Sequence, residues 1–223
     1  MASASVFEFA DSYSVSWDAE QLRASVQNRT GYLKARRISD VAVVLIAAPI
    51  ILVILLCAVV ATAIFMGMPV FIVQDRVGLD GRVFKLLKLR TMVHGQSSED
   101  RPTAPNDDRV TSFGGFMRRS HLDELPQLWN VLIGDMSLIG PRPEQAFLVK
   151  EYREALENYE LRHIVRPGLS GLAQVYYGYA ADVSETSEKL KYDLFYVQNI
   201  GLRLDLRIFL RTLTVFMNPL YVR

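Results

Sequence analysis

The sequence predicts a mainly α protein with one small β-hairpin (α+β): a monotopic membrane protein whose re-entrant, proline-broken N-terminal helix carries a cytosolic domain. No charged residue occurs between Asp40 and Asp75, so this apolar run exceeds the ~20 residues that a helix needs to cross a bilayer. Pro49 lies inside the run, where proline removes a helix hydrogen bond and clashes with the preceding turn. Basic residues flank the run on both sides: Lys34, Arg36 and Arg37 before it, and Arg76, Arg82, Lys85, Lys88 and Arg90 after it.

These flanking charges bear on the topology of the apolar run. A helix that crossed the membrane once would leave one basic cluster outside, against the usual preference of Lys and Arg for the cytoplasmic side. A segment that enters, turns at Pro49 and leaves through the same face keeps both clusters inside. A straight, proline-kinked span is the commoner arrangement in general, but the charge symmetry favours the re-entrant one. We expect a first helix to end at Ala48, because the residue before proline disfavours helical geometry, and a second to run from Ile50 to Met66.

Composition limits the classes of partner. The 223 residues carry a formal net charge of +1, so nothing indicates bulk nucleic-acid binding. The basic residues beside the apolar run can instead meet anionic lipid headgroups. The single cysteine, Cys57, cannot form an intrachain disulfide, and the three histidines show no metal-ligand spacing.

The elements after the apolar run begin with a hairpin. A strand-like run at residues 70–73 and a second at 83–90 flank the turn Leu79-Asp80-Gly81. Residues 95–109 are rich in Ser, Asp, Asn and Pro, which predicts a mobile loop over an active site. We expect a flexible joint at Gly114-Gly115.

The second half of the chain is predicted to be helical. Leu125, Leu128, Trp129 and Leu132 follow helical spacing and make an apolar face, so a helix should begin near Asp123 and end at Gly134. Pro126 is tolerated only in its first turn. We then expect a stiff turn at 140–143, a polar-faced helix over 144–163 and a loop at 166–171. Residues 202–217 predict a basic amphipathic helix that suits a membrane interface, with a core-packed helix as an equal alternative.

Asp123 and Glu124 are the candidates for chemistry. The helix dipole favours acids in a first turn without any function, so the pair alone would carry little weight. Cations accompany it, however, and a helix N-terminus among cations is a phosphate site. Carboxylates among phosphates call for a metal, for which Mg²⁺ is suited, and an aspartate can also act as nucleophile. Membrane adhesion is the competing explanation for the basic residues, but it does not explain why Pro and Gly frame Arg142 and Arg166.

Six ordered segments resemble the bacterial sugar transferases of the monotopic phosphoglycosyl transferase superfamily. Six blocks in order are far more specific than any single motif. They cover the chain from about Gly31 onward: KARRISDVAVVLIAAP (34–49), PVF with QDRVG (69–78), FKLLKLRTM (84–92), LDELPQL (122–128), GDMSLIGPRP (134–143) and RPGLSGLAQV (166–175).

The resemblance implies an activity at the cytoplasmic face of the bacterial inner membrane. Such enzymes transfer a sugar-1-phosphate from a UDP-sugar to polyprenyl (undecaprenyl) phosphate, the initiating membrane step of exopolysaccharide and glycoconjugate synthesis. By this resemblance Asp123 attacks the sugar-bearing phosphate and expels UMP, and Glu124 helps to hold Mg²⁺ or activates the acceptor. The implied substrate-binding residues are Arg118, Lys85, Lys88, Arg90, Arg142, Arg166 and Gln174.

The resemblance also divides the chain. Residues 1–30 form a variable N-terminal extension, expected to be partly helical around residues 19–26, 31–68 the re-entrant membrane helix, and 69–223 a cytosolic catalytic domain with interfacial amphipathic helices. Two positions depart from the family pattern: Ala48 replaces the usual serine before Pro49, and His121 replaces a serine before the acid pair. Membrane lipids are further expected partners, and a homodimer is compatible with the sequence.

A non-catalytic membrane adaptor is the rival prediction. It would bind anionic lipid or nucleotide sugar through the same basic surface. Such an adaptor would tolerate changes at Asp123 and Glu124, whereas an enzyme would not.

Overall fold

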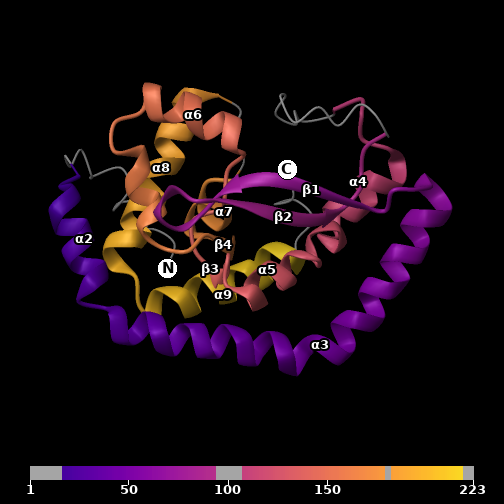
Figure 1. Ribbon diagram of the computed structural model, residues 1–223, viewed down its shortest axis with the longest axis horizontal. Coiled ribbons are helices and arrows are strands. Elements are labelled where there is room, and N and C mark those ends of the chain that lie inside the picture. The colour runs from indigo at the N-terminus through magenta and orange to yellow at the C-terminus, as the bar shows by residue number, and fades with distance from the viewer. Residues whose placement is uncertain (1–16, 94–106, 179–181, 218–223) are drawn as a thin grey trace.

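The computed structural model describes residues 17–93, 107–178 and 182–217, and helices surround two small sheets in it (Figure 1). The helices are α2 (Ala19–Gln27), α3 (Thr30–Met66), α4 (Ser112–Arg119), α5 (Gln127–Ile133), α6 (Ala146–Ala155), α7 (Leu172–Tyr176), α8 (Val183–Asn199) and α9 (Leu202–Met217), with 3₁₀ turns η1 (Leu79–Gly81), η2 (Leu122–Glu124) and η3 (Tyr159–Ile164). The strands are β1 (Phe71–Val77), β2 (Val83–Leu89), β3 (Ser137–Ile139) and β4 (Gly168–Ser170).

Helix α3 contains most of the apolar run. It has 37 residues and continues through Pro49, so the expected helix end at Ala48 and the separate helix from Ile50 are wrong. A helix can pass a proline by bending, and Figure 1 shows that α3 bends along its course. The helix is long and apolar enough to cross a membrane, and its large side chains are exposed, Ile46 by 80%. Water does not favour such a surface, which supports membrane association.

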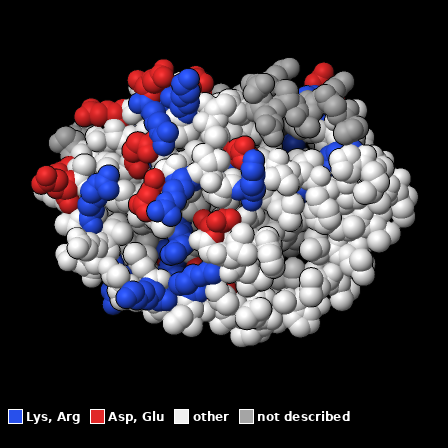
Figure 2. Space-filling view, viewed as in Figure 1, with Lys and Arg blue, Asp and Glu red and all other residues white. Residues whose placement is uncertain are grey.

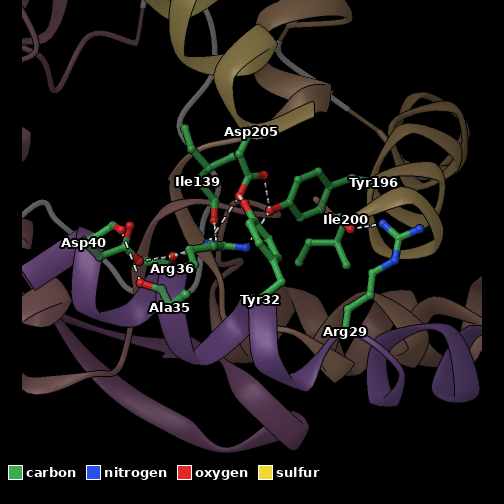
Figure 3. Close-up of polar contacts among 11 residues, drawn as sticks. Arg29, Tyr32, Ala35, Arg36, Asp40, Ile139, Tyr196, Ile200 and Asp205 are labelled. Atoms are coloured by element: carbon green, nitrogen blue, oxygen red, sulfur yellow. Dashed lines mark hydrogen bonds and ion pairs between the residues drawn. The ribbon is translucent and has the colours of Figure 1, made fainter. Parts of the chain in front are cut away.

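The first part of α3 is fixed to the domain by Arg36 (Figure 3). Its Nε lies 3.0 Å from Ser137 Oγ, its Nη1 lies 2.8 Å from the Tyr196 hydroxyl, and its Nη2 donates to the Ile139 carbonyl. The Asp205 carboxylate lies 3.4 Å from Arg36 Nε and also accepts from Tyr196, at 2.9 Å. This buried network joins α3 to β3, α8 and α9.

The last turn of α3 is fixed by Arg90, which follows β2. Its guanidinium donates to the carbonyls of Gly67 at 2.7 Å and Met68 at 3.0 Å, and also to that of Met66. Both ends of the apolar helix are therefore bound to one domain. The re-entrant topology itself stays a prediction.

The predicted hairpin is confirmed. Strands β1 and β2 are antiparallel, and Arg76 lies opposite Phe84 while Asp75 lies opposite Lys85. Because side chains alternate between the two faces of a strand, Arg76 and Lys88 share one face and Asp75 and Lys85 the other.

A second, parallel sheet joins segments that are far apart in sequence. Ser137 in β3 lies opposite Gly168 in β4, so the expected loop at 166–171 contains a strand. A side chain on Gly168 would meet the Gly140 backbone nitrogen at 2.1 Å, so the close approach requires glycine. This pairing fixes the start of the turn at 140–143, which carries Arg142.

The main core lies between α8, η3, α2 and α7. Tyr159, Leu194 and Val197 are fully buried in it. Leu22 of α2 is only 1% exposed, so part of the segment expected to be an extension packs in this core. A helix near residues 19–26 was expected and is confirmed, whereas α7 and α8 were not predicted, and the helix expected over 144–163 is divided into α6 and η3.

Two local predictions around α4 and α5 are wrong. Gly114 and Gly115 lie inside α4, and a side chain on Gly114 would meet the Thr91 carbonyl oxygen at 1.9 Å, so close packing requires this glycine. Trp129 was expected on a packed apolar face but is 58% exposed, whereas Gln127 and Asn130 are buried. The loop predicted at 95–109 lies mostly outside the described residues.

Helix α9 satisfies parts of both alternatives offered for it. Asp205 and Ile208 are buried against the domain, while Leu202, Leu206, Leu210 and Leu213 are exposed. Figure 2 shows charged side chains over one half of the visible face and a mostly uncharged surface over the other, where α3 turns toward β1.

Candidate active site

The acid pair lies in η2, immediately before α5. His121 precedes it in the left-handed backbone region, with φ of 54°, and Pro126 caps the seven-residue helix that begins at Gln127. Asp123 and Glu124 therefore precede the α-helix, and the prediction that this helix begins near Asp123 is wrong. Asp123 is 5% exposed, which is rare for a carboxylate without neighbouring cations.

Four cations from three parts of the fold surround these acids. Arg76 and Lys88 come from the hairpin, Arg118 from α4 and Arg142 from the turn after β3. Arg142 forms a two-pronged ion pair with Glu124, with 3.3 Å between Nη1 and Oε2 and a closer contact from Nη2 to Oε1. Lys88, Arg118 and Arg142 all act electrostatically on Asp123.

The two acids differ in their protonation. Burial, and then the neighbouring Glu124 charge, raise the pKa of Asp123 to about 6, against the opposing effect of the cations. Burial would also raise the pKa of Glu124, but the charge and hydrogen bonds of Arg142 outweigh it and lower that pKa. Neighbouring groups whose environments separate their pKa values are typical of active sites.

The four cations carry more positive charge than Asp123 and Glu124 can neutralise. Burial and the charge of Arg76 lower the pKa of Lys88 to about 8, and burial lowers the pKa of Arg76 to about 10. Arg118, held by a 2.9 Å bond from its Nε to Thr91 Oγ1, also has a pKa lowered by burial. The buried Nε of Arg76 has no hydrogen-bond partner within the described part of the chain. An anion with several oxygens would satisfy this excess charge and the free donor.

Four of the predicted substrate-binding residues make other contacts. Lys85 pairs with Asp75 at 2.6 Å on the opposite face of the hairpin. Arg90 caps α3, Arg166 Nε donates to the Gly134 carbonyl at 3.0 Å, and Gln174 Nε2 lies 3.4 Å from the Leu169 carbonyl. The structure thus brings Lys88, Arg118 and Arg142 to the acids and gives Lys85, Arg90, Arg166 and Gln174 structural contacts.

Arg76 was absent from the predicted site residues. The available signal was the hairpin itself, because two-residue alternation across the predicted turn puts Arg76 on the face of Lys88. His121 was interpreted as a local substitution without catalytic meaning in preference to a substrate contact, yet Glu124 and Arg142 act on its charge, and burial lowers its pKa.

The carboxylates at η2 suit Mg²⁺ by donor type. Mg²⁺ is usually held by one or two carboxylates, with waters and substrate phosphates completing the shell. Asp123 and Glu124 provide two such carboxylates, although Arg142 already binds both oxygens of Glu124. No group of three or more His, Cys, Asp or Glu that could hold a metal occurs within residues 17–93, 107–178 and 182–217.

Comparison with known proteins finds relatives over much of the chain. The chain is 41% identical over 183 residues to a UDP-N-acetylgalactosamine-undecaprenyl-phosphate N-acetylgalactosaminephosphotransferase of Aeromonas hydrophila, covering 82% of this chain and 43% of that protein. It is 43% and 36% identical to UDP-glucose:undecaprenyl-phosphate glucose-1-phosphate transferases of Xanthomonas campestris pv. campestris and Escherichia coli (strain K12), over 65% and 81% of this chain and 31% and 39% of those proteins. The chain thus spans less than half the length of each of these three relatives.

The family comparison covers nearly the whole chain. The model of the family described as "Bacterial sugar transferase" matches residues 31–219, which include α3, the hairpin, the acid pair and all four cations around it. This chain belongs to the bacterial sugar transferase family.

Proposed function

We propose that this protein transfers a hexose-1-phosphate from a UDP-sugar to polyprenyl phosphate and releases UMP. The observation that carries the proposal is a pair of acids, the buried Asp123 and its neighbour Glu124, among four cations: Arg76, Lys88, Arg118 and Arg142. Phosphoryl transfer depends mostly on positioning and on neutralising phosphate charge, which this arrangement suits. The activities in the names of the three relatives support the same reaction.

Asp123 is the proposed nucleophile. Its oxygen attacks the phosphorus that bears the sugar, the bond from this phosphorus to the bridging oxygen breaks, and UMP leaves with that oxygen. A phosphate oxygen of the lipid then attacks the same phosphorus and releases the Asp123 carboxylate. A pKa near 6 leaves Asp123 largely ionised at neutral pH, while its raised basicity makes it more nucleophilic than an ordinary aspartate.

The other residues orient the donor and neutralise charge. Lys88, Arg118 and Arg76 would bind non-bridging phosphate oxygens, where fixed donors in a buried site are most effective. Arg142 holds Glu124 ionised. When bound, Mg²⁺ supplies charge neutralisation at the diphosphate, and Asp123 and Glu124 would hold it.

The apolar helix would place this chemistry at the cytoplasmic face of the bacterial inner membrane. Both ends of α3 are bound to the same domain, through Arg36 and Arg90, which favours a helix that enters and leaves through one face. A soluble UDP-sugar and a lipid phosphate would meet at that interface. The reaction would serve as the first membrane step of exopolysaccharide or glycoconjugate synthesis.

The decisive experiment omits the lipid acceptor. Purified protein is incubated with a panel of UDP-sugars and Mg²⁺ but no polyprenyl phosphate. The covalent route predicts UMP release and roughly one trapped sugar-phosphate per active site, cleaved by hydroxylamine as an acyl phosphate would be. Asp123→Asn should give neither product.

Two other outcomes would reject parts of the proposal. If UMP formed only with acceptor present and no adduct were trapped, transfer would be direct, and Asp123 would act as a metal ligand. If no UDP-sugar gave UMP even with acceptor, while Asp123→Asn and Glu124→Gln left lipid binding intact, the membrane adaptor would replace the enzyme.

A further inference from the structure

A buried ion pair lies behind the turn that carries Arg142. Arg162 from η3 contacts Asp193 from α8, with 2.9 Å from Nε and 2.7 Å from Nη2 to the same carboxylate oxygen, and both side chains are 2% exposed. Nη2 also donates to the backbone carbonyl of Arg142 at 2.8 Å. Nη1 donates to the Tyr159 hydroxyl at 3.0 Å, so every nitrogen of this guanidinium has a partner.

The following carbonyls of the same turn are held from the hairpin side. Arg76 Nη1 donates to the Pro143 carbonyl at 2.9 Å, and the Val77 backbone nitrogen donates to the Glu144 carbonyl at 3.0 Å. The Glu144 carboxylate pairs with Lys189 of α8. Three successive carbonyls, those of residues 142 to 144, are thus bound by three different donors.

We propose that Arg162, oriented by Asp193, is a positioning residue that fixes the Arg142 backbone so that the Arg142 guanidinium meets Glu124. Pro141 and Pro143 frame Arg142, and Gly140 precedes them, so the turn is stiff but needs an external contact to set its direction. The Arg162 bond to the Arg142 carbonyl provides that contact. This inference rests on the proposed function, because it assigns Arg162 an effect on turnover.

Stability alone is a weak reason for this pair. A buried ion pair is often no more stabilising than apolar side chains of similar volume. The second oxygen of Asp193 is buried and has no hydrogen-bond partner in the described part of the chain, so the carboxylate is not optimally satisfied. What the pair does provide is a fixed donor at the Arg142 carbonyl.

The test is a double-mutant cycle on UMP release. Arg162→Lys keeps the charge but loses the planar fork that binds Asp193 and the carbonyl together, and should lower kcat about 10-fold to 100-fold, as is common for residues that orient a site. In an Arg142→Lys background the same change should have little further effect, because Arg162 acts through Arg142. Asp193→Asn is the second variant and should repeat this pattern if Arg162→Lys fails to fold.

Val197→Ala is the matched control, since Val197 is fully buried on the same helix, α8. It should lower the melting temperature while its effect on kcat adds independently to that of Arg142→Lys. Equal, additive losses for Arg162→Lys and Val197→Ala would overturn the positioning role.

A second readout needs no turnover. The Glu124 carboxyl is titrated by NMR in ¹³C-glutamate-labelled protein and assigned with Glu124→Gln. Its midpoint should move to higher pH in Arg162→Lys and Asp193→Asn but not in Val197→Ala, and an unchanged midpoint would overturn the proposal. The charged groups facing Glu124 are the same in all variants: Arg142, His121, Lys88, Asp123, Arg76 and Arg118.

The two proposals fail in distinguishable ways. Absence of UMP from the wild type would reject the proposed function while the Glu124 titration still reports on Arg162. Normal UMP release with an additive cycle would reject the positioning role alone.

Discussion

Asp123 and Glu124 are neighbours in the sequence, but the fold gives them different surroundings. Glu124 has a guanidinium of its own, whereas Asp123 is buried and receives only the diffuse field of several cations. One acid is therefore held ionised, and the other is kept closer to its protonation midpoint. This difference leads to two predictions at single residues.

The first concerns pH. The pKa of Asp123 is raised from 3.8 to about 6, so the folded state binds more protons than the unfolded state between these values. The ionised group therefore destabilises the fold above pH 6 by an amount on the order of 3 kcal/mol and has no such effect below pH 4. Asp123→Asn should raise the melting temperature at pH 7.5 but not at pH 3.5. In the wild type, UMP release should fall as pH drops through about 6, because the nucleophile becomes protonated.

Glu124→Gln serves as the comparison for this prediction. The pKa of the Glu124 carboxyl is lowered, so the ionised form stabilises the fold, and the substitution should lower the melting temperature at neutral pH. A rise for both variants would mean that removing either charge simply relieves repulsion.

The second residue prediction concerns Arg118. Its Nε bond to Thr91 orients the guanidinium, and burial makes its charge effective on Asp123 and a bound phosphate. Arg118→Ala should lower turnover by about 10²-fold or more, while sedimentation with membranes stays normal. Release from membranes with normal activity in detergent would identify Arg118 as an adhesion residue instead.

At the level of elements, α3 and the hairpin have the largest consequences. Lys88 and Lys85 lie on opposite faces of the hairpin. Arg90, just after the hairpin, caps the apolar helix instead of facing the acids. Helix α3 keeps its helical backbone through Pro49, and contacts at both of its ends hold it to the domain. The next two predictions test these elements.

Topology can be tested by cysteine labelling. In a Cys57→Ala background, Ala35→Cys places one thiol in the first turns of α3, before the apolar run, and Lys85→Cys places one after the helix, both exposed. A re-entrant helix predicts that an impermeant thiol reagent labels neither in intact cells and both after permeabilisation. Labelling of only one position in intact cells would establish a single span.

Arg90 offers a test of structural against substrate-binding roles. Arg90→Met leaves three carbonyls at the end of α3 without their donor, which should cost about 1–3 kcal/mol of unfolding free energy. The KM for the UDP-sugar should change little. A higher KM with an unchanged melting temperature would restore the substrate-binding role, and Lys85→Met, which breaks an exposed pair, is the near-neutral control.

At the scale of the whole molecule, one core joins distant parts of the chain. Leu22 from α2 is buried with α8 and η3, although the sequence suggested that residues 1–30 were a variable extension. The same core supports Arg162 and Asp193 and, through them, the turn that carries Arg142.

Loss of the packing around Leu22 should therefore destabilise the whole domain and not α2 alone. Leu22→Ala should lower the unfolding free energy by about 2–5 kcal/mol, because it opens a cavity in a close-packed core. Membrane sedimentation should persist, since α3 is unchanged. The exposed neighbour Gln21→Ala is the control, and equal stability of the two variants would show that α2 is not part of the cooperative unit.

The sequence alone determined the features that depend on local patterns. Lack of charge over a long run predicted the apolar helix, strand-like runs on either side of a Gly-containing turn predicted the hairpin, and an amphipathic pattern predicted α9. The acid pair and three of its cations, Lys88, Arg118 and Arg142, could also be named, because the cations belong to distinct motifs near it or in rigid turns.

Only the tertiary structure decided which charged residues meet. Lys88 lies in β2 and Arg90 just after it, yet Lys88 acts on Asp123 and Arg90 caps a helix, since a strand and the residue that follows it have different neighbours. The pairing of β3 with β4, and the bond from Arg162 to the Arg142 carbonyl, join segments that are distant in the sequence, so no local pattern indicates these contacts. Local sequence specifies the direction of a side chain relative to its own element, but long-range packing sets what that side chain contacts.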